Sequence, residues 1–425
     1  MEKKITYGTC EECKQPKTHY FWCNVCNAKR FQQNFNNWSS GNDDIDKFIQ
    51  DTQLSATSNY KVLEWIPYDR FHNIKYIAKG GFGKVYKANW IDGDIYYWDN
   101  ENQNWKRNGS NMKVALKSLN NSKNITSHHK LIGDSFSFII KLYGITQVPD
   151  TKNYIMVLEY ASGGSLRNYL DKSYIELRWF TKIEKLSCIA RGLNEIHKNN
   201  LIHRDLHICN ILHNYGACIT DMGLCKPADY NALENTKKSV YGVLPYIAPE
   251  ILRGQNYTKA ADIYSFGIIM YEVCSGLPPY HEVSHDINLA MKICQGLRPT
   301  FNIKVPQLIV HLIKRCLDAN PLNRPSALEV KDILDQWNDK IGETEIEKQI
   351  KEADVINDKL QTNIPSTNLS YETHSEAIYT SRLINFNNLP EPKNSDDYYN
   401  QYDNIISTEY SESIRIDFTK LKIDE

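Results

Sequence analysis

The residues best suited to chemistry are three polar groups near the middle of the chain. Asp205 and Asn210 stand five residues apart in one short stretch, and Asp221 begins an Asp-Met-Gly triplet soon after it. Groups of this kind handle Mg²⁺ and nucleotide phosphates. Transfer of a phosphoryl group asks little covalent work of a protein, but it requires charge neutralisation and in-line positioning.

A glycine-rich segment lies upstream, in Ala78-Lys79-Gly80-Gly81-Phe82-Gly83-Lys84-Val85. It follows the apolar run 74–77 and precedes a second apolar run, so it predicts a loop between two strands. Glycine lets the backbone approach phosphate oxygens because no Cβ intervenes. Taken alone, an ordinary hairpin turn explains the loop equally well. Val114-Ala115-Leu116-Lys117 then places a lysine on a predicted strand.

Together with the segments that follow them, these motifs resemble those of protein kinases. The H-R-D motif ends at Asp205, Asp221-Met222-Gly223 stands for D-F-G, Lys117 ends the equivalent of V-A-I-K, and Ala248-Pro249-Glu250 matches A-P-E. The resemblance spans about residues 66–337. It implies an α+β, two-lobed protein kinase fold, with a small β-rich N-lobe at about 66–160 and a larger helical C-lobe at about 161–337.

The resemblance also implies roles for individual residues. Asp205 would accept or orient the proton of the substrate hydroxyl, and Asn210 and Asp221 would bind Mg²⁺. Lys117 would pair with the α and β phosphates of ATP. The remaining expected ATP contacts are Ala78, Gly80, Gly81, Phe82, Gly83, Val85, Ala115, Leu158 as gatekeeper, Glu159 and Ala161 through their backbone, and Leu212.

Three further matches are expected to support the fold and not the chemistry. Glu250 of the A-P-E motif would pair with Arg324, and Asp262 would lie on a helix under the catalytic loop. A buried carboxylate paired with arginine holds a fold without touching ATP.

The chain departs from the kinase pattern where helix αC is expected. No glutamate occurs between Ser118 and Leu158, and the segment after Lys117 is about ten residues shorter than usual. Asp134 is the nearest acidic replacement for the glutamate that normally pairs with the lysine. Three explanations stay open: an incomplete gene model, an active kinase that uses another carboxylate, or a pseudokinase that serves as a nucleotide-binding scaffold.

The substrate motifs resemble the tyrosine-kinase-like group, whose members mostly phosphorylate Ser or Thr. His207 stands where such kinases carry lysine, and it would either donate to the γ-phosphate when protonated or simply pack there. Arg204 would hold a phosphorylated activation loop, and Thr236, Ser239 and Tyr241 are the candidate acceptors.

Four cysteines near the start form a separate pattern. Cys10 and Cys13 make one C-x-x-C pair, and Cys23 and Cys26 make a second. Two such pairs resemble a zinc ribbon or paired rubredoxin-like knuckles and predict a structural Zn²⁺ site. His19 is an alternative ligand, although a solvent-facing position on the intervening hairpin is the expected one.

Composition limits the class of protein and its partners. The net charge of −1 argues against a nucleic-acid-binding surface, and no apolar stretch is long enough to span a membrane. Seven of the eleven cysteines are scattered through the kinase region, as in proteins with reduced thiols. We expect a cytoplasmic protein, with the nucleus as the alternative compartment, that acts on protein substrates and signalling partners.

The predicted organisation has four parts: a zinc module at 1–35, a linker at 36–65 with a short helix near 43–53, the kinase domain at 66–337, and a mostly disordered polar tail at 338–425. Residues 91–111 form an insertion rich in Asp, Asn and Gly, which predicts a surface hairpin. Within the tail, one helix is expected over 344–360.

Overall fold

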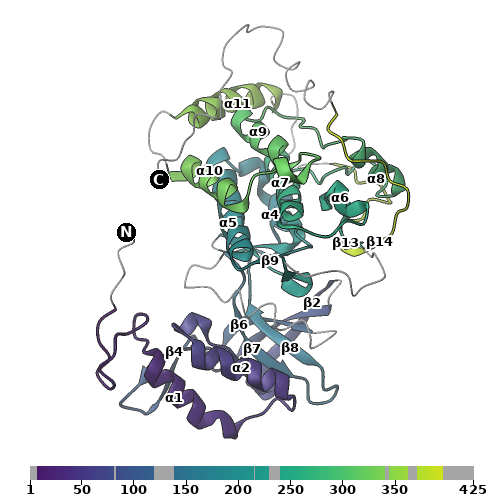
Figure 1. The fold of residues 1–425 in the computed structure, drawn as a ribbon. Helices are drawn as coiled ribbons and strands as arrows, with labels where there is room; N and C mark the ends of the chain where they lie inside the picture. Colours follow the sequence, from purple (N-terminus) through teal and green to yellow (C-terminus); the bar gives the residue numbers. More distant parts are fainter. Residues whose placement is uncertain are drawn as a thin grey trace.

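The computed structural model describes residues 7–80, 83–118, 138–214, 216–228, 240–339, 344–361 and 371–395. They form a smaller lobe built on a β-sheet and a larger helical lobe, with helices α1 and α2 lying across the smaller lobe (Figure 1). The described helices are α1 Asn24–Asn34, α2 Asp43–Ser55, α4 Leu166–Ser173, α5 Trp179–Lys198, α6 Pro249–Leu252, α7 Lys259–Ser275, α8 Ile287–Cys294, α9 Gln307–Cys316, α10 Ala327–Asp339 and α11 Glu345–Gln361. The predicted α+β fold of two lobes is confirmed.

The smaller lobe contains a six-stranded sheet in the order β1-β7-β8-β6-β3-β2. Only β1 and β7 pair in parallel, and every other neighbouring pair in this sheet is antiparallel. The described strands are β1 Glu64–Trp65, β2 Phe71–Gly80, β3 Gly83–Trp90, β4 Asp94–Asp99, β5 Asn104–Asn108, β6 Met112–Ser118, β7 Leu142–Gln147, β8 Tyr154–Glu159, β9 Leu201–Ile202, β10 Ile211–His213, β11 Ala217–Ile219, β12 Lys226–Pro227, β13 Val240–Gly242 and β14 Arg382–Ile384.

Strand β6 has two faces with different tasks. Val114 and Leu116 are buried on one face, and side chains alternate along a strand, so Ala115 and Lys117 point to the other. The register of β6 with β8 sets Leu158 opposite Ala115. The lysine, its neighbour Ala115 and the predicted gatekeeper therefore share one face of the sheet.

Helix α2 covers part of that same face. Its Ile45, Phe48 and Ile49 belong to one buried cluster with Met156 and Leu158 of β8. The helix begins at an Asn42 side chain that accepts hydrogen bonds from the second and third residues of α2, as an N-cap should. The predicted helix is present, but the description of residues 36–65 as a polar linker is wrong, because this segment is part of the hydrophobic core of the lobe.

The insertion forms the predicted hairpin, built from β4 and β5. It is not a plain surface loop, since Trp105 of β5 stacks on Phe31 of α1 with ring centroids 4.6 Å apart and on Trp22 at 5.7 Å. Ile95 of β4 joins the same buried cluster. The hairpin therefore packs the N-terminal module onto the smaller lobe.

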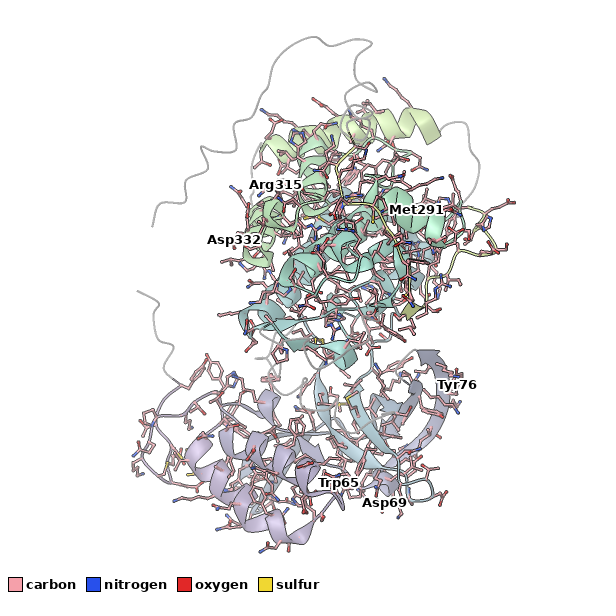
Figure 2. All side chains as sticks on the ribbon, turned by 45° about the vertical axis from the view of Figure 1, so that its right-hand side comes forward. Trp65, Asp69, Tyr76, Met291, Arg315 and Asp332 are labelled. Carbon is pink, nitrogen blue, oxygen red and sulfur yellow. The ribbon has the colours of Figure 1, made fainter. Side chains whose placement is uncertain are left out.

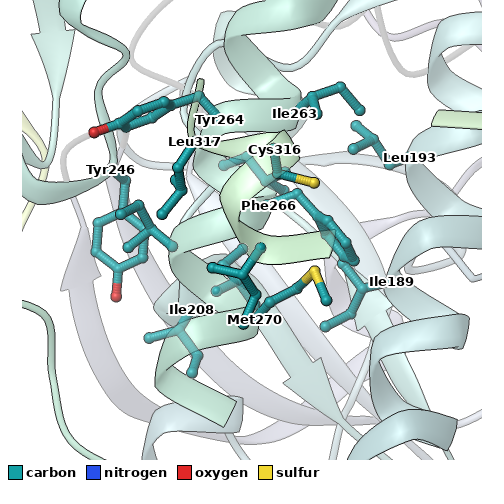
Figure 3. Close-up of a cluster of buried hydrophobic side chains, with 14 of the residues drawn as sticks. Ile189, Leu193, Ile208, Tyr246, Ile263, Tyr264, Phe266, Met270, Cys316 and Leu317 are labelled. Carbon is teal, nitrogen blue, oxygen red and sulfur yellow. The ribbon is translucent and has the colours of Figure 1, made fainter. Parts of the chain in front are cut away.

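Helix α7 lies at the centre of the larger lobe. It is apolar around most of its circumference and almost entirely buried, as expected of a helix surrounded by other elements. Figure 3 shows its Phe266 and Met270 beside Ile189 of α5, within the main hydrophobic core. The helix ends at Gly276, whose left-handed backbone at φ 76° suits glycine.

Part of the C-terminal tail is ordered against the larger lobe. Helix α11 lies where the sequence predicts a helix. Residues 371–395 run along the larger lobe and include β14, which pairs with β13 (Figure 1). The prediction of a disordered tail is therefore wrong for residues 371–395. Its hydrogen bonds to the lobe could not be read from a polar, turn-rich composition.

The predicted pair of Glu250 and Arg324 is confirmed. The Arg324 guanidinium donates to both Glu250 carboxylate oxygens at 2.7 and 2.8 Å, and its side chain is fully buried. Arg324 also donates to the carbonyls of Asp318 and Ala260. One side chain thus joins the segment after α9 to the A-P-E segment and the start of α7.

Replacing Arg324 with alanine should lower the free energy of unfolding by ~3–5 kcal/mol, because Glu250 would be left buried and unpaired. Arg315→Ala is the matched control: Arg315 lies at the edge of the lobe (Figure 2) in an exposed pair with Glu329, and its loss should cost about 1 kcal/mol or less. Chemical denaturation of the two variants provides the measurement. Equal losses would contradict a structural role for the buried pair.

Candidate active site

The loop between β9 and β10 is held from below by the buried carboxylate of Asp262. This carboxylate accepts hydrogen bonds from the backbone amides of His203 at 2.8 Å and Arg204 at 3.0 Å, and it contacts His197 Nε2 at 2.9 Å. Burial alone would raise the pKa of Asp262, but these partners outweigh it and hold the pKa below the usual range. The predicted position of Asp262 under the loop is confirmed.

His203 connects this loop to the strand that precedes Asp221. Its Nε2 lies 3.0 Å from the Thr220 carbonyl, while its Nδ1 accepts from the Asp205 amide at 3.3 Å. Arg204 and Asp221 both adopt a left-handed backbone, at φ 71° and 61°. Such conformations cost energy in residues other than glycine and persist only where the surroundings fix them.

Asp205 lies at the centre of the loop and is 4% exposed. Burial raises the pKa of its carboxyl group to about 6, although several hydrogen bonds act in the opposite direction. The Asn210 side-chain nitrogen donates to the Asp205 carbonyl at 2.9 Å. With that nitrogen engaged, the amide oxygen of Asn210 is the atom suited to a metal ion.

Lys117 and Asp221 meet across the two lobes in an ion pair of 2.5 Å. Burial would raise the pKa of Asp221, but the Lys117 ammonium outweighs burial and holds the pKa below its usual range. Asp221 therefore stays ionised, as a metal ligand must. The structure brings the predicted phosphate cation and a predicted Mg²⁺ ligand to one place.

The predicted adenine contacts also converge. Ala115, Leu158 and Leu212 come from β6, β8 and β10 and belong to one hydrophobic cluster, so they can flank a planar base. The Glu159 amide donates to the Lys141 carbonyl at 2.9 Å, and Ala161 is buried two residues later.

The glycine loop is described in part. Ala78 pairs with Val85 and Gly80 with Gly83, so two strands join there as predicted. A Cβ on Gly83 would lie 2.3 Å from the Ser118 carbonyl oxygen, which explains why glycine is required. The predicted contacts Gly81 and Phe82 lie outside the described residues, as do Asp134, Thr236 and Ser239.

His207 is buried beside Asp205, with 3.8 Å between its Nε2 and the nearer carboxylate oxygen. Burial lowers the pKa of its imidazole to about 3, so the ring is neutral near pH 7. Of the two roles open from the sequence, packing is favoured over donation by a protonated ring. Its ring centroid lies 5.8 Å from that of Tyr246.

The residue that sequence reasoning missed is Ser381. Its hydroxyl donates to Asp205 Oδ2 at 2.7 Å and lies 3.0 Å from Oδ1. Ser381 is 176 residues from Asp205 in the chain and belongs to no recognisable motif. The pairing of β14 with β13 brings it to the site.

The four N-terminal cysteines form a second candidate site. Their sulfur atoms all lie within 4.8 Å of one another, with Cys10 and Cys26 at 3.8 Å and Cys13 and Cys23 at 3.5 Å. Cys23 directly precedes α1, so the second pair opens a helix and does not lie on a second ribbon turn. His19 is outside this cluster, with its ring against Tyr7, Tyr20 and Tyr60.

Comparison with known families agrees with this geometry. The family described as protein tyrosine and serine/threonine kinase matches residues 71–334. The chain belongs to this family. The matched residues include the lysine of β6, the loop of Asp205 and the Asp221 segment.

Individual relatives carry similar descriptions. A probable serine/threonine-protein kinase of Dictyostelium discoideum is 30% identical over 63% of this chain and 15% of the relative. A probable LIM domain-containing serine/threonine-protein kinase of the same organism is 29% identical over 62% of this chain and 39% of the relative. A probable serine/threonine-protein kinase of Arabidopsis thaliana is 28% identical over 61% of this chain and 66% of the relative. The chain therefore spans less than two thirds of the length of each of these relatives.

Among the helices of the described residues, none combines the length and the apolar character that crossing a bilayer requires.

The pKa of Asp205 predicts how its ability to accept a proton depends on pH. Only the ionised carboxylate can accept a proton, so turnover should fall as the pH drops through about 6, approaching a tenfold loss per pH unit below that value. The check is kcat at saturating ATP between about pH 5 and pH 8, with circular dichroism at each pH to verify folding. A rate that stays constant down to pH 5 would contradict this assignment.

Proposed function

We propose that this protein transfers the γ-phosphate of ATP to serine or threonine hydroxyls of proteins in a signalling pathway. The observation that carries the proposal is a seryl hydroxyl held 2.7 Å from the buried carboxylate of Asp205. The charge of Asp221, paired with Lys117, acts on that same carboxylate. An acceptor, a base and a phosphate-binding pair are therefore assembled in one site.

The residues divide the work of transfer between them. Asp205 orients the acceptor hydroxyl and takes its proton as the oxygen attacks the γ-phosphorus. Lys117 would bind the α and β phosphates, and Ala115, Leu158 and Leu212 would enclose the adenine. Asn210 and Asp221 would hold Mg²⁺, which supplies charge neutralisation on the phosphates when bound.

The hydroxyl at Asp205 supports serine or threonine as the acceptor class. The relatives above are described as serine/threonine kinases. The nearest tyrosine of the docked segment, Tyr379, instead donates its hydroxyl to the Pro279 carbonyl at 2.9 Å.

The second candidate is a pseudokinase that binds nucleotide as a scaffold. The sequence favours it at one point, the shortened segment without glutamate after Lys117, and residues 119–137 lie outside the described part of the chain. Incubation with radiolabelled ATP followed by phosphoamino-acid analysis discriminates between the two. Label in phosphoserine or phosphothreonine supports the enzyme, whereas nucleotide binding without transfer supports the scaffold.

Substituting Asp205 with asparagine should lower kcat by ~10²–10⁴, the usual contribution of a positioned acid-base group, because the amide cannot accept the proton. ATP affinity should be nearly unchanged, since Asp205 does not contact the phosphates in this mechanism. Steady-state kinetics and nucleotide binding measure the two effects. Full activity in the variant would remove Asp205 from the mechanism.

Asp221→Asn is the matched comparison. It also replaces a carboxylate by an amide of the same size, but it removes a charged ligand from the metal. Its main effect should be weaker binding of Mg-ATP, with a changed dependence of ATP affinity on Mg²⁺. The two variants therefore separate proton transfer from metal binding.

We also propose that Cys10, Cys13, Cys23 and Cys26 hold a structural Zn²⁺ ion. Four thiolates at ~2.3 Å from a tetrahedral zinc lie about 3.8 Å apart. The sulfur separations of 3.8 Å between Cys10 and Cys26 and 3.5 Å between Cys13 and Cys23 are close to this value. The four cysteines form a small cluster of their own, while the cluster of Trp22 and Phe31 packs the module onto the smaller lobe. Metal binding would contribute much of the folding free energy of so small a module.

Purified protein should contain one equivalent of zinc per chain by elemental analysis. Cys10→Ser should lose the metal and lower the stability of the module, because serine is a poor zinc ligand. Cys188→Ser is the control, since Cys188 lies on α5 in the kinase domain and should leave the zinc content unchanged. Equal zinc in both variants would exclude the cysteine cluster as the binding site.

The proposed compartment is the cytoplasm, with the nucleus as the alternative. None of the eleven cysteines lies in a disulfide bond, and most of them are buried. Reduced, buried thiols are typical of a reducing compartment.

A further inference from the structure

The segment 371–395 follows a continuous path over the larger lobe. Near its start, His285 bonds it twice: the His285 amide donates to the Glu376 carbonyl at 3.2 Å, and the Ile378 amide donates to the His285 ring at 3.0 Å. Near its end, Arg253 pairs with Glu391, and the Asn394 side chain accepts from the Ala319 amide at 2.8 Å. The segment is therefore fixed on both sides of Ser381.

Strand pairing determines which residue of the segment reaches Asp205. Strand β14 runs antiparallel to β13, with its first residue, Arg382, opposite Gly242. Ser381 directly precedes this pair and lies just beyond the end of the ladder. A Cβ on Gly242 would lie 3.4 Å from Asp205 Oδ1 and 3.2 Å from Ile247. Glycine at this position therefore keeps a side chain from crowding Ile247 and the carboxylate of Asp205.

Ser381 is held as an acceptor would be. Its hydroxyl donates to Asp205 at 2.7 Å and lies 3.2 Å from His207 Nε2, while its carbonyl accepts from the Tyr241 hydroxyl at 3.1 Å. The neighbouring Thr380 is exposed. One hydroxyl of the segment is thus selected by both the strand register and the side-chain contacts.

We propose that Ser381 is an intramolecular phosphorylation site of this kinase and that residues 371–395 occupy its peptide-binding groove until that reaction takes place. The inference rests on the proposed function and adds a substrate to it. In the reaction, the Ser381 oxygen forms a bond to the γ-phosphorus of ATP as the bond to the bridging oxygen breaks. Asp205 takes the hydroxyl proton, and ADP leaves.

The product should not remain where the substrate was. A phosphoserine carries a charge of about −1.5 to −2 at neutral pH, and it would stand against the Asp205 carboxylate. Repulsion between these charges should release the segment and open the groove to other protein substrates. The docked tail therefore delays the activity of the kinase toward other proteins until Ser381 is modified.

The test begins with full-length protein that has been treated with a phosphatase. After addition of Mg-ATP, peptide mapping by mass spectrometry should find phosphate on Ser381, with a rate constant that does not depend on enzyme concentration. Phosphorylation of casein in the same mixture should show a lag that ends as Ser381 becomes modified. Ser381→Ala should lose that phosphate and keep the low initial rate on casein, whereas Thr380→Ala should behave as the wild type.

Ser381→Glu provides a readout that does not require turnover. The introduced carboxylate should expel the segment, so the amides of β13 should lose protection from hydrogen exchange and the lag on casein should disappear. Ser375→Glu places the same charge on an exposed residue of the same segment and should change neither property. Unchanged protection in Ser381→Glu would overturn the docking part of the proposal.

The remaining outcomes separate this inference from the proposed function. Phosphorylation of casein without phosphate on Ser381 would overturn the inference and leave the kinase activity intact. A Ser381 rate that rises in proportion to enzyme concentration would overturn the intramolecular step. If neither Ser381 nor casein is phosphorylated, both the proposed function and the inference are overturned.

Discussion

The buried carboxylate of Asp262 fixes the backbone on which the catalytic groups stand. It accepts hydrogen bonds from the amides of His203 and Arg204. The His203 ring in turn hydrogen-bonds to the backbone of Asp205 and Thr220. A buried carboxylate without hydrogen-bond partners would destabilise the fold, so the loop is stable only in the arrangement that supplies those partners. The left-handed backbone of Arg204 belongs to this network, and that of Asp221 directly follows Thr220. Positions of reacting groups thus depend on a side chain that takes no part in the reaction.

The smaller lobe depends on residues that precede the kinase domain. Helix α2 buries Ile45, Phe48 and Ile49 on the face of the sheet that carries Lys117, and the insertion hairpin stacks Trp105 on the module. Without α2, one face of the sheet would expose its apolar side chains to water. The core of so small a lobe has few other elements to bury them against. The N-terminal module and the kinase domain therefore form one packed unit, and the placement of the strand lysine rests on both.

The C-terminal segment and an external substrate would use the same edge of β13. Backbone pairing gives such a contact affinity without much dependence on sequence, while the register decides which side chain meets Asp205. A tethered segment has a high effective concentration, so even weak contacts keep it docked. Phosphorylation of Ser381 would directly shift the equilibrium between the docked and the released segment, because Ser381 contacts the catalytic carboxylate.

Local motifs predict the kinase fold and the candidate groups of the site, because phosphoryl transfer requires particular groups in a set order along the chain. Asp205, Asn210, Asp221 and Lys117 are predicted from such motifs, and the structure brings them together. Glu250, Arg324 and Asp262 are predicted from neighbouring motifs, and their buried contacts confirm that they support the fold. The packing of α2 and the stacking of Trp105 are not predicted. A few apolar residues within a polar segment do not show which other element they pack against. The neutral state of His207 and the raised pKa of Asp205 needed the burial of both side chains. Only the tertiary structure placed Ser381 at the catalytic carboxylate, because its position follows from strand pairing and hydrogen bonds across 176 residues of chain, for which local sequence carries no signal.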